Sequence, residues 1–324
     1  MCTAITYTSG DHYFGRNLDL DHSYCETVTV TPRRYPFVFR RAPALKDHYA
    51  LIGMAYVADG YPLYYDATNE KGLSMAGLNF PASAHYQPEQ AGADNITPFE
   101  FIPWLLGQCA DLAEARQLLS RINLVNLPFS AQLPLSPLHW LIADQSGALV
   151  AEPLREGLKI WDNPVGVLTN EPPFDYQLFN LNNHMQLTRE APRSSFAPGL
   201  DLKPYCLGMG AIGLPGDLSS SSRFVRAAFT RLNSVSGPSE EKSVSQFFHI
   251  LGSVAQTRGC ARAEADRYEI TLYSSCCNMD RGIYYYTTYG NRRISAVDLH
   301  RENLEGTDVV SYPLHQQQDI LFQN

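Results

Sequence analysis

The chain has 324 residues, 44% of them hydrophobic and 18% charged, with a formal net charge of −8. This composition is typical of a globular protein with enough chain for a large core. The acidic balance and the lack of Lys or Arg runs argue against a nucleic-acid partner, which would need a basic stripe. No apolar run reaches the roughly 18 residues of a membrane-spanning helix, so we expect no membrane insertion.

The first residues and the cysteines indicate the cellular compartment. The chain does not open with the basic and apolar segments of a secretory signal. The seven cysteines are an odd number at scattered spacing, which is typical of reduced thiols. The sequence therefore predicts a cytoplasmic protein.

Motifs for metals and cofactors are missing or out of context. The nine histidines include no H-x-x-x-H pair, and no C-x-x-C occurs, so we predict no metal site. Residues 208–213 match G-x-G-x-x-G, but Leu214-Pro215-Gly216 follows where a dinucleotide site needs a helix. We predict a glycine-rich loop there and no cofactor.

The first third of the chain is rich in predicted strands. Ser9-Gly10-Asp11 is a turn sequence, and the segments 3–7 and 12–18 on either side of it form a predicted hairpin. Further strands are predicted at 27–31, 49–57, 63–67 and 73–78. The last of these follows a turn at 69–72.

The middle of the chain carries predicted helices in blocks. Thr97-Pro98-Phe99-Glu100 has the form of a capping box, and Asp111 begins a second helix signal. Strands are predicted at 138–143, 149–152 and 166–169, and residues 190–218 are rich in Pro and Gly and predicted to be irregular. Helices follow at 219–232 and 245–254, and the chain ends in predicted strands at 268–275, 282–289 and 293–299.

The order of these elements indicates the fold class. Strands gather at both ends of the chain, and strict alternation of strand and helix is absent. This order favours an α+β fold with antiparallel sheets covered by helices over a doubly wound sheet. We see no repeat and no long linker, so we predict one domain over residues 1–324.

Cys2 is the candidate nucleophile. If Met1 is removed, Cys2 carries a thiol and a free α-amine. An α-amine ordinarily has a pKa of about 7.7–8.0, so near neutral pH part of it is unprotonated and can accept the proton of a thiol. Such a site also needs positive groups that favour the thiolate and donors for the oxyanion on the attacked carbonyl.

Motifs along nearly the whole chain suggest where those groups are. They are the Met-Cys-Thr start, FGRNLD at 14–19, NEKGLSMAGLN at 69–79, LTN at 168–170 and SRFVR at 222–226. In this order they resemble the choloylglycine hydrolase family, and within it the bile salt hydrolases. That family belongs to the N-terminal nucleophile hydrolases, whose fold is a four-layer α-β-β-α sandwich of two mainly antiparallel sheets.

The resemblance implies a set of roles. Met1 would be removed, and Cys2 would attack the amide of a glycine- or taurine-conjugated bile salt to form a thioester acyl-enzyme. Asp19 would hold the α-amine, with Arg16 and Arg223 near the thiol. The oxyanion would receive the side-chain N–H of Asn170 and the backbone N–H of Asn79. The family also implies a homotetramer, with residues 190–218 as the expected assembly segment.

Each of these residues also has a purely structural interpretation. Arg16 and Asp19 could end a solvated strand, Asn79 could lie in a turn, Asn170 could be a cap, and Arg223 could lie on the polar face of an amphipathic helix. Residues three apart on a regular strand point to opposite faces. If Arg16 and Asp19 both approach Cys2, the strand must therefore end or bulge near residues 17–18.

The substrate is the open part of the interpretation. Penicillin V acylases of the same family share the catalytic set, but their position equivalent to Asn79 tends to be Tyr, so Asn79 favours bile salts. A steroid needs a broad apolar pocket. The predicted walls, for which ordinary packing is the alternative, are Leu18, Tyr61, Tyr64, Tyr65, Phe129 and Leu133. Other function classes are a non-catalytic bile-salt-binding protein and the amidase half of a glutamine amidotransferase, although the chain has no synthase domain.

Overall fold

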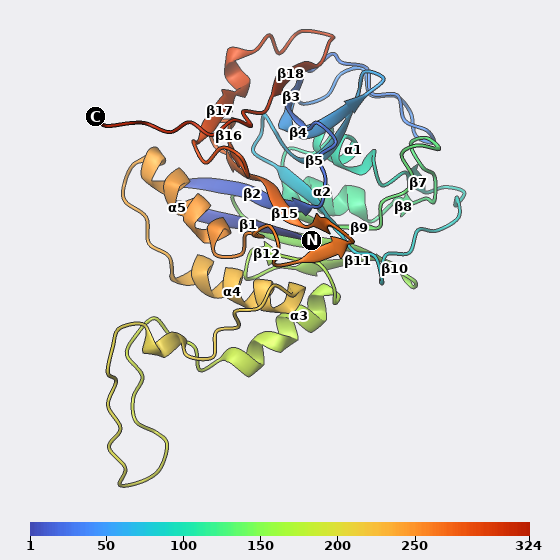
Figure 1. The fold of residues 1–324 in the computed structure, drawn as a ribbon. Coiled ribbons are helices and arrows are strands. Elements are labelled where there is room, and N and C mark those ends of the chain that lie inside the picture. Colours follow the sequence, from blue (N-terminus) through green and yellow to red (C-terminus); the bar gives the residue numbers. More distant parts are fainter.

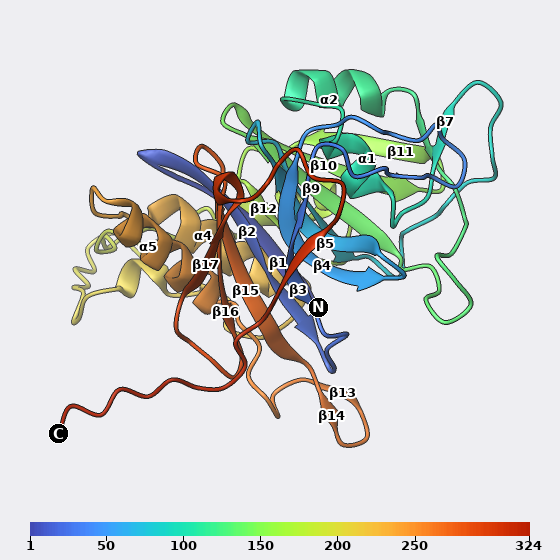
Figure 2. The same ribbon diagram turned by 90° about the horizontal axis from the view of Figure 1, so that it is seen from above.

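Two large antiparallel sheets lie face to face between layers of helices (Figures 1 and 2). The structure is a computed structural model that describes all residues 1–324. The six-stranded sheet has the order β12 (Val167–Leu168), β1 (Cys2–Ser9), β2 (Asp11–Leu20), β15 (Ile270–Asn278), β16 (Ile283–Thr288) and β17 (Ser295–Asp298). It thus joins the two ends of the chain.

The eight-stranded sheet is built mainly from the first half of the chain. Its order is β11 (Gly157–Asp162), β10 (Gly147–Leu154), β9 (Leu138–Asp144), β6 (Ser74–Asn79), β5 (Tyr61–Asn69), β4 (Leu51–Ala58), β3 (Thr27–Thr31) and β18 (Val310–Pro313). Two small sheets pair β7 (Asp94–Ile96) with β8 (Ile122–Leu124) and β13 (Arg262–Glu264) with β14 (Arg267–Tyr268).

Helices cover the outer face of each sheet (Figure 2). The six-stranded sheet carries α4 (Ser220–Asn233) and α5 (Glu240–Gly252), with α3 (Phe174–Asn180) packed beside α4. The eight-stranded sheet carries α1 (Phe101–Leu106) and α2 (Leu112–Leu119). The predicted four-layer α-β-β-α sandwich is confirmed. No helix combines the length and the apolar character that crossing a membrane requires.

The apolar residues form two cores that follow these layers. The larger contains Cys2 and residues of both sheets together with the inner faces of α4 and α5. The smaller lies between the eight-stranded sheet and the helices α1 and α2. Strand side chains alternate between faces, so a strand buried on both sides contributes to both cores. β4 is such a strand, with Ile52 and Met54 in the larger core and Leu51 and Ala55 in the smaller, whereas the buried residues of β1 all belong to the larger core.

The predicted elements are largely present, with shifted ends. The capping box at Thr97 forms only in part: the Thr97 N–H donates to Glu100 Oε2 at 3.2 Å, but the Thr97 hydroxyl has no partner and the helix starts at Phe101. The last predicted helix begins at Glu240 rather than Ser245, because Ser239 caps it by accepting from Lys242 N.

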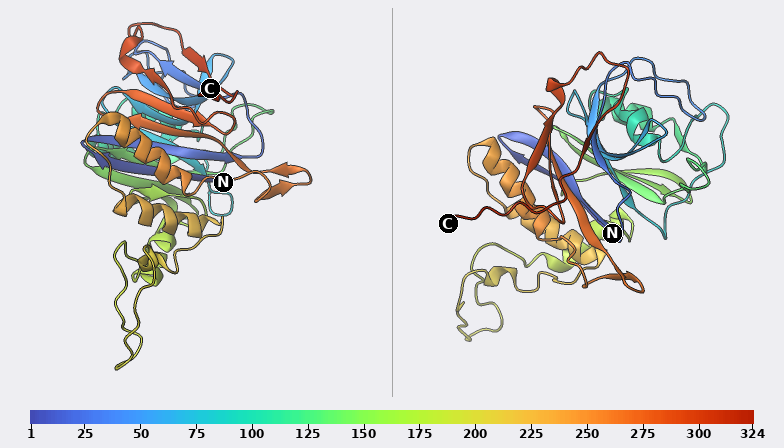
Figure 3. Two further views of the ribbon diagram at one scale, coloured as in Figure 1. Left: turned by 60° about the vertical axis from the view of Figure 1, so that its left-hand side comes forward. Right: turned by 45° about the horizontal axis from the view of Figure 1, so that its top comes forward.

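Residues 185–214 form an arm that projects from the body below α3 and α4 (Figures 1 and 3). As predicted, this region is irregular apart from the 3-10 turn Met209–Ala211. We call residues 185–214 the arm. It exposes large apolar side chains: Met185 is 85% exposed, Phe196 83%, Tyr205 84% and Leu207 100%.

Candidate active site

Cys2 begins β1 in the interior of the six-stranded sheet. It lies directly opposite Leu18 of β2 and is only 3% exposed. On the other side of β1, the short strand β12 pairs with Ala4 and Ile5 and ends just before Thr169 and Asn170. The pairing brings Asn170 beside Cys2, and the Cys2 N–H donates to Asn170 Oδ1 at 2.8 Å.

Asn170 connects three elements at this point. Its Oδ1 also accepts from an Arg223 guanidinium N–H at 2.7 Å. Its Nδ2 donates to the backbone oxygen of Asn79, at the end of β6 in the other sheet, at 2.7 Å. One N–H of the amide is used in this bond, and the other has no hydrogen-bond partner in the chain. Asn79 and Asn170 thus meet across the gap between the sheets, and one donor remains free.

Arg223 lies on the inner face of α4, not on its solvent face. The side chain is fully buried and donates to the backbone oxygen of Cys2 and to Thr3 Oγ1, the latter at 2.7 Å. Burial lowers the pKa of Arg223, opposed by the negative charges of Asp19, Cys2 and Glu269. The amphipathic-helix interpretation therefore does not apply to this residue.

Asp19 lies next to the amino end of the chain. Its carboxylate is fully buried, Oδ1 accepts from Thr271 Oγ1 at 2.6 Å, and Oδ2 has no partner. The Met1 ammonium donates to the Asp19 backbone oxygen at 2.8 Å and to both carboxylate oxygens of Glu269 at 2.9 Å. Burial raises the pKa of Asp19, opposed by Arg223 and the terminal ammonium. A buried carboxylate with a free acceptor oxygen can form a charge-assisted hydrogen bond with an ammonium group.

Arg16 approaches Cys2 from between the two sheets. Its guanidinium is fully buried and donates to the backbone oxygens of Tyr65, at 3.0 Å, and Gly77 in the eight-stranded sheet. Its Nη2 has no partner. Burial alone would lower the pKa of Arg16, but negative charge at Cys2 and Asp66 raises it. A charged guanidinium with an unused donor therefore lies by Cys2.

The strand irregularity predicted near residues 17–18 lies on the neighbouring strand instead. β2 pairs with β1 in regular register through Leu18. The register shift is in β15, where Thr271 faces Asp19 and Tyr273 faces Leu18, so Leu272 is the extra residue. β2 therefore keeps its alternation: Arg16 faces the other sheet, and Asp19 faces α4. The prediction of a bulge in β2 was wrong because the two residues flank Cys2 from opposite faces.

Comparison with known proteins agrees with this geometry. The family model described as linear amide C-N hydrolases, choloylglycine hydrolase family, matches residues 2–312. The chain belongs to the choloylglycine hydrolase family. It is 59% identical over 97% of both chains to the bile salt hydrolase/transferase of Lactiplantibacillus plantarum, and 37% identical over 96% of both chains to that of Clostridium perfringens.

Solved structures support the same assignment. A variant of the conjugated bile acid hydrolase from Clostridium perfringens superposes with a TM-score of 0.91 at 35% identity, covering 100% of both chains. The penicillin V acylase from Agrobacterium tumefaciens, at 19% identity, superposes with a TM-score of 0.75 over 98% of this chain and 94% of its own. The second comparison shows the shared fold only.

The predicted pocket walls are divided between two faces of the eight-stranded sheet. Leu18 lies opposite Cys2, and the Tyr65 backbone oxygen binds Arg16, so both border the site. Tyr64 belongs to the core under α1, where its hydroxyl lies 2.7 Å from Thr31 Oγ1. This position does not support Tyr64 as a wall, because adjacent strand residues point to opposite faces and its neighbour Tyr65 faces the site side.

The remaining predicted walls form a separate aromatic group. The Tyr61 ring lies 5.9 Å from the Phe129 ring and 6.1 Å from the Phe99 ring. Leu133 is half-buried in the same loop as Phe129, between β8 and β9. No contact with Cys2 ties this group to the site, and its role in substrate binding stays a prediction.

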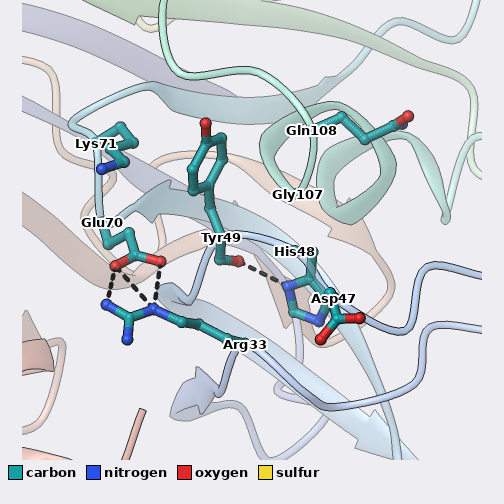
Figure 4. A pocket seen from close by; sticks show the side chains of 8 residues that line it. All are labelled: Arg33, Asp47, His48, Tyr49, Glu70, Lys71, Gly107 and Gln108. Carbon is teal, nitrogen blue, oxygen red and sulfur yellow. Dashed lines mark hydrogen bonds and ion pairs between the residues drawn. The ribbon is translucent and has the colours of Figure 1, made fainter. Parts of the chain in front are cut away.

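A large surface hollow lies elsewhere (Figure 4). It has a volume of about 660 Å³ and is lined mainly by polar side chains, among them Arg33, His48 and Glu70. None of the residues around Cys2 belongs to it. Arg33 and Glu70 form an ion pair with each other, so the two charges in the hollow are already partnered within the chain.

Sequence reasoning missed the groups that bind the predicted site residues and the amino end of the chain. Glu269 binds the terminal ammonium, Thr271 binds Asp19, and Thr3 binds Arg223. Glu269 and Thr271 reach the site only because β15 pairs with β2, about 250 residues earlier in the chain. No local pattern marks such a partner.

Proposed function

We propose that this chain hydrolyses the amide bond of glycine- or taurine-conjugated bile salts, with Cys2 as the nucleophile. The observation that carries the proposal is the convergence on Cys2 of Asn170 and two buried arginines, with Asp19 beside the amino end of the chain. The 59% identity to an enzyme named bile salt hydrolase/transferase supports the substrate class.

Removal of Met1 would prepare the nucleophile. The new α-amine remains within reach of Asn170 Oδ1, which already accepts from the Cys2 N–H, and the unpaired Asp19 Oδ2 would accept from it. The unprotonated amine takes the proton of the Cys2 thiol. Arg16 and Arg223 stay charged and favour the thiolate. We infer a cytoplasmic location, where the thiol stays reduced.

The thiolate then attacks the amide carbonyl carbon of the substrate. The free N–H of Asn170 and the backbone N–H of Asn79 stabilise the oxyanion. The C–N bond breaks, the α-ammonium gives its proton to the leaving nitrogen, and a thioester remains on Cys2. Water attacks this thioester while the amine accepts its proton. The bile acid leaves, and the returning thiolate completes the cycle.

The acyl side of the substrate would be held by apolar groups at the mouth of the site. Leu18 lies opposite Cys2, and Asn79 is exposed although the rest of β6 is buried. An open position at Asn79 leaves room for the flat steroid acyl group. Tyr61, Phe129 and Leu133 would extend this wall if the loop that carries the last two closes over the substrate.

The substitution Cys2→Ser tests this proposal. The hydroxyl ionises far less readily than the thiol, so glycocholate turnover should fall by at least about two to three orders of magnitude. Binding measured by calorimetry should change by less than about 1 kcal/mol, because the pocket is untouched. Intact mass should show that the active protein lacks Met1. Near-normal turnover by the serine variant, or full activity with Met1 retained, would refute the mechanism.

The same preparation should be tested with alternative substrates. Glycocholate, taurocholate, penicillin V and glutamine are offered in parallel, and glycine, taurine, phenoxyacetate and ammonia are measured. Preferred cleavage of the bile salts supports the proposed substrate. Preferred cleavage of penicillin V would assign the chain to the acylase branch, and binding of bile salts without turnover would make it a binding protein.

We also propose that the arm assembles the chain into a homotetramer. The arm exposes a row of large apolar side chains that a monomer would leave in water, and such surfaces are typical of protein contacts. Leu207→Asp, in the arm, should dissociate the assembly, whereas Val38→Asp, at an exposed residue outside it, should not. Sedimentation velocity would distinguish the two variants, and a monomeric unsubstituted protein would refute the proposal.

A further inference from the structure

We propose that His139 and Glu152 form a buried imidazolium–carboxylate pair that positions the oxyanion donors, Asn79 and Asn170. The pair does not touch the reacting atoms, so both members are positioning residues. The inference deepens the proposed function and rests on it, because the donors matter only if an oxyanion forms at Cys2.

Both side chains are completely buried in the eight-stranded sheet. His139 belongs to β9 and Glu152 to the adjacent strand β10. Their relative exposures are 0%, and His139 Nδ1 lies 3.0 Å from Glu152 Oε1. Burying a charged group costs folding free energy unless the group is paired and hydrogen-bonded. A charged pair at this depth therefore needs a hydrogen-bond partner for each of its polar atoms.

The hydrogen-bond partners fix the protons of the pair. His139 Nε2 lies 2.9 Å from the backbone oxygen of Thr169, which can only accept, so Nε2 carries a hydrogen. Glu152 accepts from the Phe174 N–H on Oε1 at 3.0 Å and from the Trp161 Nε1–H on Oε2 at 3.1 Å. These donors favour the ionised carboxylate. His139 Nδ1 must then also carry a hydrogen, and the ring is an imidazolium.

The pair holds the segment that carries Asn170 at both ends. Thr169, directly before Asn170, is bound by His139, and Phe174, four residues after Asn170, is bound by Glu152. Thr169 follows β12 of the six-stranded sheet, whereas both members of the pair belong to the eight-stranded sheet. The two hydrogen bonds therefore connect the layers beside the site.

The same imidazole supports Asn79 from the other side. The Phe80 ring stacks on the His139 ring, with centroids 4.1 Å apart and planes inclined by 6°. Phe80 directly follows Asn79, whose backbone oxygen accepts from Asn170 Nδ2 at 2.7 Å. His139 thus contacts the chain neighbour of each oxyanion donor and sets their separation across the gap between the sheets.

The kinetic test compares three variants. His139→Gln and Glu152→Gln should lower kcat about ten- to a hundredfold, the scale of a misplacement near 1 Å at a reacting group, with KM changed by less than about threefold. His48→Gln is the matched control: this histidine is also buried, its ring nitrogens lie 2.7 and 2.8 Å from the backbone oxygens of Tyr49 and Tyr35, and it lines the hollow of Figure 4 instead of the site. It should lose stability but keep kcat. Thermal unfolding checks that each variant is folded.

A second measurement tests the pair without substrate and without substitution. In protein labelled with ¹⁵N-histidine, His139 should show hydrogens directly bonded to both ring nitrogens, because Thr169 and Glu152 each accept from one of them. Glu152 is the titratable side chain that the ring bonds, beside the Thr169 backbone oxygen and the stacked Phe80, so Glu152→Gln should remove one of the two signals. The signals are assigned by their loss in His139→Gln.

Specific outcomes would overturn the inference. A single nitrogen-bound hydrogen on His139 refutes the imidazolium. Wild-type kcat in folded Glu152→Gln, or an equal loss of kcat in His48→Gln, refutes the positioning role. If the unsubstituted protein fails to cleave glycocholate, the proposed function fails instead, and the spectrum still decides whether the pair exists.

Discussion

Substituting Asn170 by Asp separates the two tasks that its side chain has in the proposed mechanism. Asp keeps an oxygen for the Cys2 N–H and for Arg223, which donate to Asn170 Oδ1 at 2.8 and 2.7 Å. It removes both N–H groups, including the donor to the Asn79 backbone oxygen. If the amide serves the oxyanion, the variant should fold and bind substrate but turn over poorly.

The expected magnitudes follow from these contacts. Loss of one oxyanion donor lowers kcat about 10²- to 10³-fold, which corresponds to an activation free energy raised by about 3–4 kcal/mol. Asn170→Ala should also lose stability, because the Cys2 N–H, an Arg223 N–H and the Asn79 oxygen all lose a partner. Each unpaired buried group costs about 1–3 kcal/mol, so we expect about 3 kcal/mol or more for Ala and less for Asp, whose carboxylate still pairs with Arg223.

The assay is glycine release from glycocholate, with stability followed by urea unfolding. Asn163→Asp is the matched control. Asn163 is buried, its Nδ2 donates to the Val167 backbone oxygen at 2.9 Å, and its Oδ1 accepts from two backbone N–H groups in the turn before β12. This control should lose stability and keep kcat. Turnover by Asn170→Asp within about threefold of the unsubstituted protein would refute the donor role.

Further predictions concern the support of the site. Gly15→Ala should lower the free energy of unfolding by about 3 kcal/mol or more in urea, because a Cβ would lie 2.0 Å from the Ser275 backbone oxygen, whereas Gly252→Ala, with nothing within 4 Å, should not. Arg16→Lys should lower glycine release about tenfold, since one ammonium cannot both bond the two carbonyls that Nη1 now bonds and supply the separate, unused Nη2 donor; an unchanged kcat would contradict this. Burial raises the pKa of Asp66, so the folded protein holds the carboxyl proton more tightly than the unfolded chain does. The free energy of unfolding should therefore fall as the pH rises from about 4 through the raised pKa, and it should fall less in Asp66→Asn. Parallel curves of unfolding free energy against pH for the two proteins would contradict this sign.

The fold was predictable where local pattern decides it. The hairpin of β1 and β2 follows from a turn sequence between two apolar segments, and once it forms, Cys2 must lie opposite Leu18. The amphipathic pattern of α4 likewise predicts a helix, though not that Arg223 lies on its buried face. Hydrophobic periodicity alone would place a charged side chain such as Arg223 in solvent. Only the motif resemblance identified it as a site residue.

Long-range pairing was not predictable from local pattern. The strand β18 pairs with β3 although some 280 residues separate them, and no short-range signal selects that partner. The same limit applies to the buried polar groups. Asp66 accepts from Tyr273 at 2.7 Å and from Tyr284 at 2.6 Å, across the gap between the sheets, but in the sequence it is one acidic residue in a strand. Only the packed sheets show that it has partners.

The position of Cys2 at the first residue of a central strand explains why its partners come from two directions. Cys2, Leu18 and Arg16 share the face toward the eight-stranded sheet, because opposed residues share a face and alternate residues return to it. Asp19 is one step out of phase and faces α4, where Arg223 also lies. In the proposed mechanism the thiolate and the amine therefore have separate environments: Arg16 faces the sulfur between the sheets, and Asp19 serves the amine on the helix side. From that side Arg223 binds the Cys2 backbone oxygen and adds positive charge near the thiolate. The three-residue spacing of Arg16 and Asp19 on a regular strand places them on opposite faces, and two separate environments require that placement.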